Sequence, residues 1–236
     1  MSIFEIVVLL LSALVGAGFV WFAGVRSGRS LKLLLSFSGA FLFGITVLHL
    51  LPEVYHQHGI NAGAFVLIGF ILQILLEFFS KGVEHGHMHL HDLPKGIFPI
   101  SIFISLCIHS FMEGMPLGHD HGEDHALLSG IAIHKLPVAV TLASILVSSG
   151  SSKTKLVLLM VLFALMAPVG VFVGELLEHS NLTAQSDAFS IILALVAGMF
   201  LHISTTILFE ISHSHKFDRI KFGVVIVGSL LAYFVT

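Results

Sequence analysis

Cysteine is nearly absent from this chain, and charged residues are scarce. Cys107 is the single cysteine in 236 residues, which excludes an internal disulfide and a cluster of metal-binding thiolates. Only 11% of the residues are Asp, Glu, Lys or Arg, and no basic stripe supports nucleic-acid binding. No Lys or Arg precedes Arg26. The first apolar stretch therefore lacks the basic region of a cleaved signal peptide and is expected to be retained.

Apolar residues make up most of what remains. They account for 56% of the chain, and the mean hydropathy is +1.01. A bilayer core requires about 20 apolar residues per helix, whereas barrel strands would be about ten residues long with strict alternation. We predict an all-α polytopic membrane protein in which residues 1–236 form one transmembrane domain. Its eight predicted spans are 3–24, 33–54, 61–80, 97–117, 126–149, 155–177, 187–210 and 218–235.

The basic residues are distributed asymmetrically. Every Lys and Arg except Lys135 falls in the connections after the first, third, fifth and seventh spans. The positive-inside rule makes those connections cytoplasmic and places both termini outside. The loss of one span would destroy this asymmetry, which therefore favours eight.

Three polar residues interrupt the fourth and fifth spans. His109 and Glu113 are four residues apart, so they share one helix face. His134 lies on the next, oppositely directed span. At 1.5 Å per residue, all three lie roughly 10–18 Å below the outer surface. Imidazole and carboxylate groups can ligate one divalent cation, and ionisable residues at this depth normally mark an ion or proton path.

Prolines accompany these polar residues. A proline within a helix frees the carbonyl four residues earlier, and three times the residue after that carbonyl is a candidate ligand. The carbonyls are those of Leu48, Met112 and Ile133, and the residues that follow them are His49, Glu113 and His134. This pattern indicates a path lined by the second, fourth and fifth spans. The alternative is that the prolines only kink their helices and the histidines bond to neighbouring backbone.

Further intramembrane polar residues are ordered by depth. The outer ones are His49 and Glu53, and the inner ones are His202, Thr206 and Glu210, spaced i, i+4 and i+8. Together they could form a series of weak sites along a pathway. The alternative for His202 is a packing histidine. Glu77 has no such partners in the sequence and is expected at the lipid edge or between helices.

The cytoplasmic connection at residues 81–96 is rich in histidine. Its alternating histidines predict weak, transient zinc binding, although a solvated loop without that role is the alternative. A structural zinc site is excluded because it would need fixed tetrahedral spacing. The residues concerned are His85, His87, His89 and His91.

These motifs resemble the ZIP (Zrt/Irt-like) family of divalent metal transporters. The fourth-span motif His-x-x-x-Asp/Glu-Gly stands here as His109, Glu113 and Gly114, and the fifth-span motif keeps His134 and Pro137. Two further matches are Leu48 to Glu53 and Ala197 to Leu201. The resemblance implies eight spans, outward termini, a His-rich cytoplasmic loop, and an inverted repeat of spans 1–3 and 6–8 around spans 4–5.

The fifth span departs from the family pattern. Members with two adjacent metals use the second, fifth and sixth motif residues, which here are Lys135, Val138 and Ala139. A charged ammonium group cannot ligate metal. We therefore predict one metal, held by His109, Glu113 and His134, with Lys135 in the second-metal position and paired with Glu113. The alternative for Lys135 is a lysine that snorkels to water.

The predicted function is transport of a divalent cation to the cytosol by alternating access, with the two repeats rocking against each other. Zn²⁺ is the first choice, and Fe²⁺, Mn²⁺ and Cd²⁺ also suit the ligands. The metal is cargo, and no resident cofactor is expected. The alternatives are a metal sensor or non-transporting relative, and export. A metalloenzyme is disfavoured because no His-Glu-x-x-His occurs on any span.

Assembly and location are also predicted. Gly63, Ala64 and Gly69 are small enough to allow close helix packing in a homodimer. The compact, undecorated chain indicates a bacterial inner membrane, and an organelle membrane is the alternative.

Overall fold

The fold is described from a computed structural model, which covers residues 2–24, 28–56, 61–83, 99–118, 125–179, 187–209 and 218–236. Within these residues the secondary structure is helical, with no strand. The elements are α1 (Ile3–Ala23), α2 (Arg29–Ile45), η1 (Thr46–Leu50), α3 (Leu51–His56), α4 (Ala62–Ser80), α5 (Ile100–Gly114), η3 (Met115–Gly118), α6 (His125–Ser148), α7 (Lys153–His179), α8 (Asp187–Phe209) and α9 (Arg219–Val235).

The predicted membrane spans correspond to these helices. Seven stretches in the described residues are long and apolar enough to cross a bilayer, and α2, η1 and α3 together form one of them, Arg29–His56. The eighth predicted span is α9, which has 17 residues and a length of about 25 Å. The fold class of an all-α membrane protein is therefore confirmed. The second span is longer at both ends than the sequence predicted.

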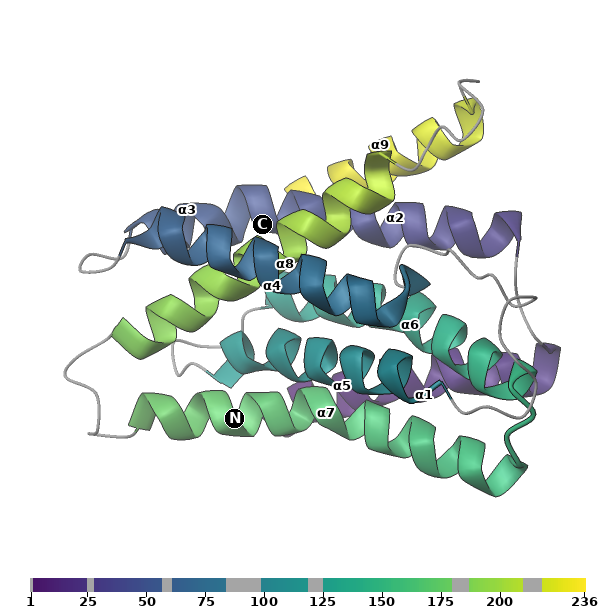
Figure 1. The fold of residues 1–236 in the computed structure, drawn as a ribbon. Helices are drawn as coiled ribbons and strands as arrows, with labels where there is room; N and C mark the ends of the chain where they lie inside the picture. The colour runs from purple at the N-terminus through teal and green to yellow at the C-terminus, as the bar shows by residue number, and fades with distance from the viewer. Residues whose placement is uncertain are drawn as a thin grey trace.

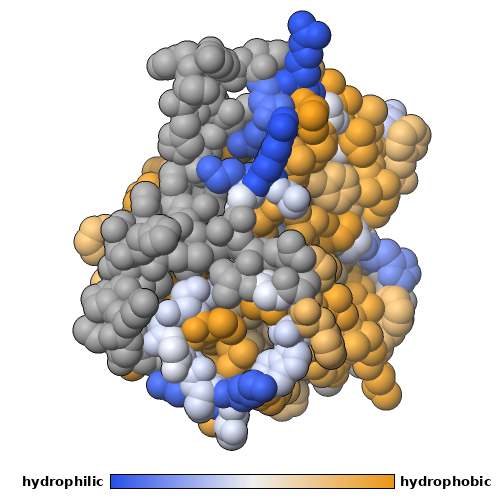
Figure 2. All heavy atoms as spheres, turned by 90° about the vertical axis from the view of Figure 1, so that its right-hand side faces the viewer, coloured by the Kyte–Doolittle hydropathy of each residue, from blue (hydrophilic) through white to orange (hydrophobic). Residues whose placement is uncertain are grey.

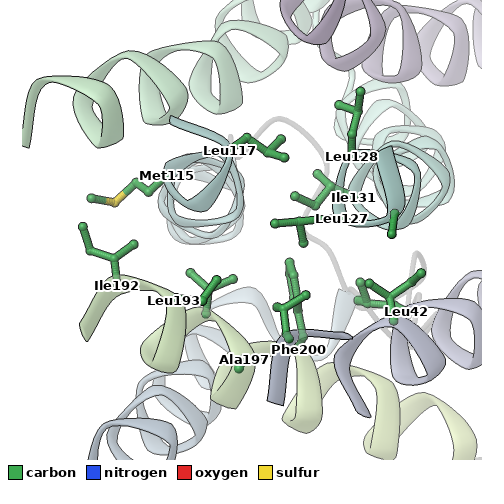
Figure 3. Close-up of a cluster of buried hydrophobic side chains, with 14 of the residues drawn as sticks. Leu42, Met115, Leu117, Leu127, Leu128, Ile131, Ile192, Leu193, Ala197 and Phe200 are labelled. Atoms are coloured by element: carbon green, nitrogen blue, oxygen red, sulfur yellow. The ribbon is translucent and has the colours of Figure 1, made fainter. Parts of the chain in front are cut away.

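The long helices of the described residues pack in two groups (Figure 1), one with α1, α5, α6 and α7 and the other with α2, α4, α8 and α9. In one group α1 packs on α6 and α7, and α5 packs on α7; in the other, α8 packs on α4 and α2, and α2 also packs on α9. A cluster of buried hydrophobic side chains joins the groups (Figure 3), where Leu42 of α2 and Phe200 of α8 face Leu127 and Ile131 of α6. Two interhelical contacts between the groups, α2 with α6 and α4 with α5, frame the site described below.

Apolar side chains also cover much of the outer surface (Figure 2). Large hydrophobic residues are exposed along α1, α4, α7 and α9, and examples are Phe22, Phe78, Leu158 and Phe234. A water-soluble protein rarely exposes an apolar surface of this extent. These faces are suited to contact with lipid.

Glycines set the closest helix contacts. A Cβ at Gly69 of α4 would lie 1.9 Å from the Leu195 carbonyl oxygen of α8, and a Cβ at Gly198 of α8 would lie 1.9 Å from the Val66 oxygen of α4. Gly69 is therefore occupied by a helix of its own chain, and the prediction that it serves a dimer contact is wrong. Gly63 and Ala64 are exposed, and the homodimer stays a prediction.

A second glycine contact joins α5 to α7. A Cβ at Gly114 would lie 2.1 Å from the Ala167 carbonyl oxygen, and one at Gly170 would lie 2.0 Å from the Phe111 oxygen. Backbone atoms cannot move aside as a flexible side chain can, so this contact requires residues without a side chain. It fixes α7 against the segment of α5 that carries Glu113.

Gly170→Ala is accordingly expected to destabilise the protein by about 1–3 kcal/mol, the usual cost of overpacking. The matched control is Gly18→Ala, because Gly18 also lies within a span, α1, and a Cβ there meets nothing within 4 Å. Thermal unfolding of the two variants in detergent measures the difference. Equal melting temperatures would show that α5 and α7 are not in close contact at this point.

Candidate metal site

Three predicted ligands converge between α5 and α6. His109 Nε2 lies 3.0 Å from Glu113 Oε1, and His134 Nε2 lies 3.9 Å from the same oxygen. One ligand atom from each residue lies within 4.8 Å of the other two, and this is the one such group in the described residues. The helical spacing and the matched depths of the two spans therefore predicted their proximity correctly.

The three side chains suit a divalent metal ion. Zinc binds imidazole nitrogen at about 2.0–2.1 Å and carboxylate oxygen at about 2.0–2.2 Å, so a nitrogen and an oxygen on one ion are at most about 4.3 Å apart. Small side-chain movements would suffice to close the observed group around one ion. His109, Glu113 and His134 are all at most 2% exposed. Water would therefore compete little for the ion once it was bound.

The backbone around the site differs in one respect from the prediction. Pro116 was expected to free the carbonyl of Met112, but that oxygen accepts a hydrogen bond from the Met115 N–H. The chain tightens here from the α-helix α5 into the 3₁₀-helix η3. Hydrogen bonds in a 3₁₀-helix span three residues instead of four, so one of them uses the carbonyl that the proline would have left unpaired. The carbonyl of Met112 is therefore not available as predicted.

The other two prolines act differently. Before Pro52 the helix widens into the π-turn η1, in which the Leu51 N–H donates to the Thr46 carbonyl. Such π-turns are rare and occur frequently at functional sites. Pro137 lies inside α6, which continues on both sides of it, so the fifth span remains one helix.

Lys135 lies directly beside the three ligands. Its Nζ is 3.9 Å from Glu113 Oε2, donates a hydrogen bond to Ser110 Oγ, and lies 5.1 Å from the centroid of the Phe163 ring. The lysine is 1% exposed, so it does not snorkel to the surface. Its ammonium group supplies a positive charge next to the Glu113 carboxylate.

A further contact reaches His109 from α4. The Nδ1 of His109 lies 3.3 Å from the Gln73 side-chain oxygen, and both groups are buried. Gln73 was not among the predicted site residues. The available signal was its position four residues from Gly69 and four from Glu77, which places all three on one face of an otherwise apolar helix.

The inner pathway residues form a separate contact. His202 Nε2 of α8 is paired with the Glu77 carboxylate of α4, and the Phe70 ring packs edge-on against the imidazole with 4.9 Å between centroids. Glu77 therefore lies between helices, one of its two expected positions, although its pairing with His202 was not predicted. Thr206 donates its hydroxyl to the backbone carbonyl of His202, so that hydroxyl is bonded within its own helix.

The remaining predicted residues lie elsewhere. His49 of η1 and Glu53 of α3 are half-buried, and neither belongs to the group of converging ligand atoms. Several predicted residues fall outside the described residues, namely Glu210, His85, His87, His89 and His91.

Comparison with known proteins identifies the family. The profile of the ZIP zinc transporters matches residues 84–236, which is well over half of the chain and includes all three converging ligands. The chain belongs to the ZIP zinc transporter family. The resemblance predicted from the sequence is thereby confirmed.

Individual relatives of this ZIP protein are distant. Protein zntD of Dictyostelium discoideum is 29% identical over 63% of this chain. Zinc transporter ZIP9-A of Xenopus laevis is 24% identical over 76% of it, and zinc transporter ZIP1 of Danio rerio is 28% identical over 52%. The chain spans 24% of the length of zntD, 67% of ZIP9-A and 46% of ZIP1.

These relatives bear on the predicted location. The family and the apolar helices show that the ZIP protein is an integral membrane protein. The relatives named above come from eukaryotes. The prediction of a bacterial inner membrane therefore has no support.

Proposed function

We propose that this ZIP protein transports a divalent metal ion, Zn²⁺ first, across the membrane toward the cytosol. The observation that carries the proposal is the buried convergence of His109, Glu113 and His134 in a chain of the ZIP zinc transporter family. Relatives named as zinc transporters support the choice of metal. Fe²⁺, Mn²⁺ and Cd²⁺ suit the same donors, since imidazole and carboxylate ligands do not select one metal alone.

In this proposal the three side chains hold one ion at a time. Two neutral imidazoles and one carboxylate leave at least one coordination position open. An open position allows the ion to enter and leave through exchange with water or a pathway residue. His49 and Glu53 would pass the ion inward from outside, and the Glu77–His202 pair lies next to Thr206 on the proposed exit route.

Lys135 would keep the site mononuclear. Its ammonium group lies 3.9 Å from Glu113 Oε2, whereas His109 contacts the other carboxylate oxygen, Oε1. A second cation placed there would meet a buried positive charge, and charge repulsion is strong where water is excluded. The lysine would thus replace a second metal ion and neutralise Glu113 when the site is empty.

The arrangement of helix pairs supports an inverted repeat of spans 1–3 and 6–8. In such a repeat, α1, α2 and α4 correspond in order to α7, α8 and α9, and α5 corresponds to α6. The α4–α8 contact then corresponds to the α9–α2 contact, and the α1–α6 contact corresponds to the α7–α5 contact. All four contacts are extensive. An exchange of this kind is expected for transporters built from two oppositely oriented repeats.

Alternating access would then move the two groups of helices rather than the two repeats. The close packing of α4 on α8 at Gly69 and Gly198 joins a helix of the first repeat to one of the second, so rocking the repeats apart would break it. The boundary between the groups lies instead along α2–α6 and α4–α5. We propose that the site on α5 and α6 is carried past α2, α4 and α8.

Zinc entry into sealed liposomes tests the proposal. Purified protein in liposomes that contain a zinc-sensitive dye is expected to admit external Zn²⁺ faster than protein-free liposomes do. Zinc binding without entry would contradict transport and favour the second candidate, a metal sensor or non-transporting relative. Lys135 in place of a second-metal ligand is the observation that favours that candidate.

A further inference from the structure

The side-chain oxygen of Gln73 in α4 contacts a proposed metal ligand, His109. It is fully buried, although the membrane-spanning window of its helix is only 22% buried. A buried amide in an apolar environment is costly unless its polar atoms are bonded. The position of Gln73 therefore suggests a task beyond helix packing.

The bond to Gln73 constrains the protonation of His109. A neutral imidazole carries one proton, either on Nδ1 or on Nε2, and the hydrogen bond made by one nitrogen determines which nitrogen is free to bind metal. The Gln73 oxygen accepts hydrogen bonds and cannot donate them. This oxygen lies 3.3 Å from His109 Nδ1, so it favours a proton on Nδ1, and a neutral imidazole protonated there keeps its lone pair on Nε2.

The lone pair on Nε2 then points at the proposed ion position. His109 Nε2 lies 3.0 Å from Glu113 Oε1, and the ring of His109 meets the His134 ring edge-on at 6.0 Å between centroids. A histidine that binds metal almost always donates its other N–H to a carbonyl, carboxylate or water. Gln73 supplies such an acceptor from a helix that contributes no ligand of its own.

We propose that Gln73 is a positioning residue that fixes the tautomer and ring orientation of His109 for metal binding. This inference rests on the proposed function, because it requires His109 to be a metal ligand. The bond also joins the two helix groups, since Gln73 lies on α4 and His109 on α5. The contact therefore favours the metal-binding tautomer of His109 in the conformation described here, in which α4 of one group packs against α5 of the other.

The test measures zinc affinity of the purified, full-length protein by calorimetric titration with Zn²⁺ alone. Gln73→Met removes the acceptor and keeps the size of the side chain. Its affinity is expected to fall about 10- to 100-fold, as is typical for loss of a partner that orients a metal ligand. Gln73→Glu retains an acceptor oxygen and is expected to bind zinc at least as tightly as the wild type.

Ser105→Ala is the matched control. The Ser105 hydroxyl donates to the Leu76 carbonyl at 2.6 Å, so it is a second buried hydrogen bond between the same helices, α5 and α4, that touches no proposed ligand. This variant is expected to bind zinc as the wild type does. The visible spectrum of bound Co²⁺ adds a signature of ligand geometry, and it is expected to change in Gln73→Met and to stay unchanged in Ser105→Ala.

The outcomes separate this inference from the proposed site. If Gln73→Met binds zinc as the wild type does while His109→Ala binds it weakly, the positioning role is overturned and the site stands. If Ser105→Ala loses as much affinity as Gln73→Met, the effect belongs to general α4–α5 packing and the inference is also overturned. If the wild type binds no zinc, or His109→Ala binds it equally well, both fail. Should Gln73→Glu not fold, the comparison of Gln73→Met with Ser105→Ala still decides.

Discussion

His134→Ala is expected to weaken zinc binding by at least about 100-fold, beyond the usual range for losing a residue that only orients a ligand, and to reduce zinc entry into liposomes to the background rate. His134 is completely buried and contributes the only candidate ligand from α6. Without it the ion would retain one imidazole and one carboxylate from α5. Two ligands on a single helix cannot fix the position of that ion relative to α6.

The control for this variant is Thr141→Ala. Thr141 is also fully buried in α6, and its hydroxyl bonds the Pro137 carbonyl of its own helix at 2.8 Å. The control is expected to fold and to transport zinc at close to the wild-type rate. Wild-type flux in a well-folded His134→Ala variant would mean that the ion takes another route.

Lys135→Met is expected to destabilise the metal-free protein by about 3–5 kcal/mol, the range found when one member of a buried ion pair is removed. The substitution leaves the Glu113 carboxylate, 2% exposed, without its neighbouring positive charge. Zinc supplies positive charge at the same carboxylate. Adding zinc should therefore raise the melting temperature of Lys135→Met by more than it raises that of the wild type.

The double variant Glu113→Gln with Lys135→Met separates the charge effect from packing. With both charges removed, no uncompensated ion remains, and most of the lost stability is expected to return although zinc no longer binds tightly. Thermal melts of the two single variants and the double variant form the required cycle. A Lys135→Met protein as stable as the wild type without metal would contradict the ion pair.

The membrane spans and the convergence of the three candidate ligands could be predicted from the sequence because both depend on local patterns. A span requires only a continuous apolar segment, and the pairing of His109 with Glu113 follows from helical spacing. His134 could be added because two adjacent spans run in opposite directions and place it at the same depth. Each of these arguments uses residues on one span or on neighbouring spans.

The contacts of α4 could not be predicted in this way. Gln73 and His109 are separated by 36 residues, and Glu77 and His202 by 125. Their meeting depends on which helices become neighbours, and an apolar helix can pack on any side in lipid. The partner of Gly69 could not be predicted for the same reason, because a small residue permits close packing without specifying the partner helix.

The backbone at Pro116 illustrates a different limit. The sequence shows that the proline cannot donate its own hydrogen bond, but not how the chain before it adjusts. Here the chain tightens into η3, and Met115 bonds the Met112 carbonyl that was expected to be free. The choice between an open carbonyl and a tighter turn depends on packing, including the close contact of Gly114 with α7.

The central claim is that one metal ion binds between His109, Glu113 and His134. Crystals of the full-length protein grown with zinc, and measured on both sides of the zinc absorption edge, test it most directly. We expect one anomalous peak within about 2.2 Å of a ligand atom from each of the three residues, with the Lys135 ammonium in place of a second peak. No peak between these residues, or two adjacent peaks there, would contradict it.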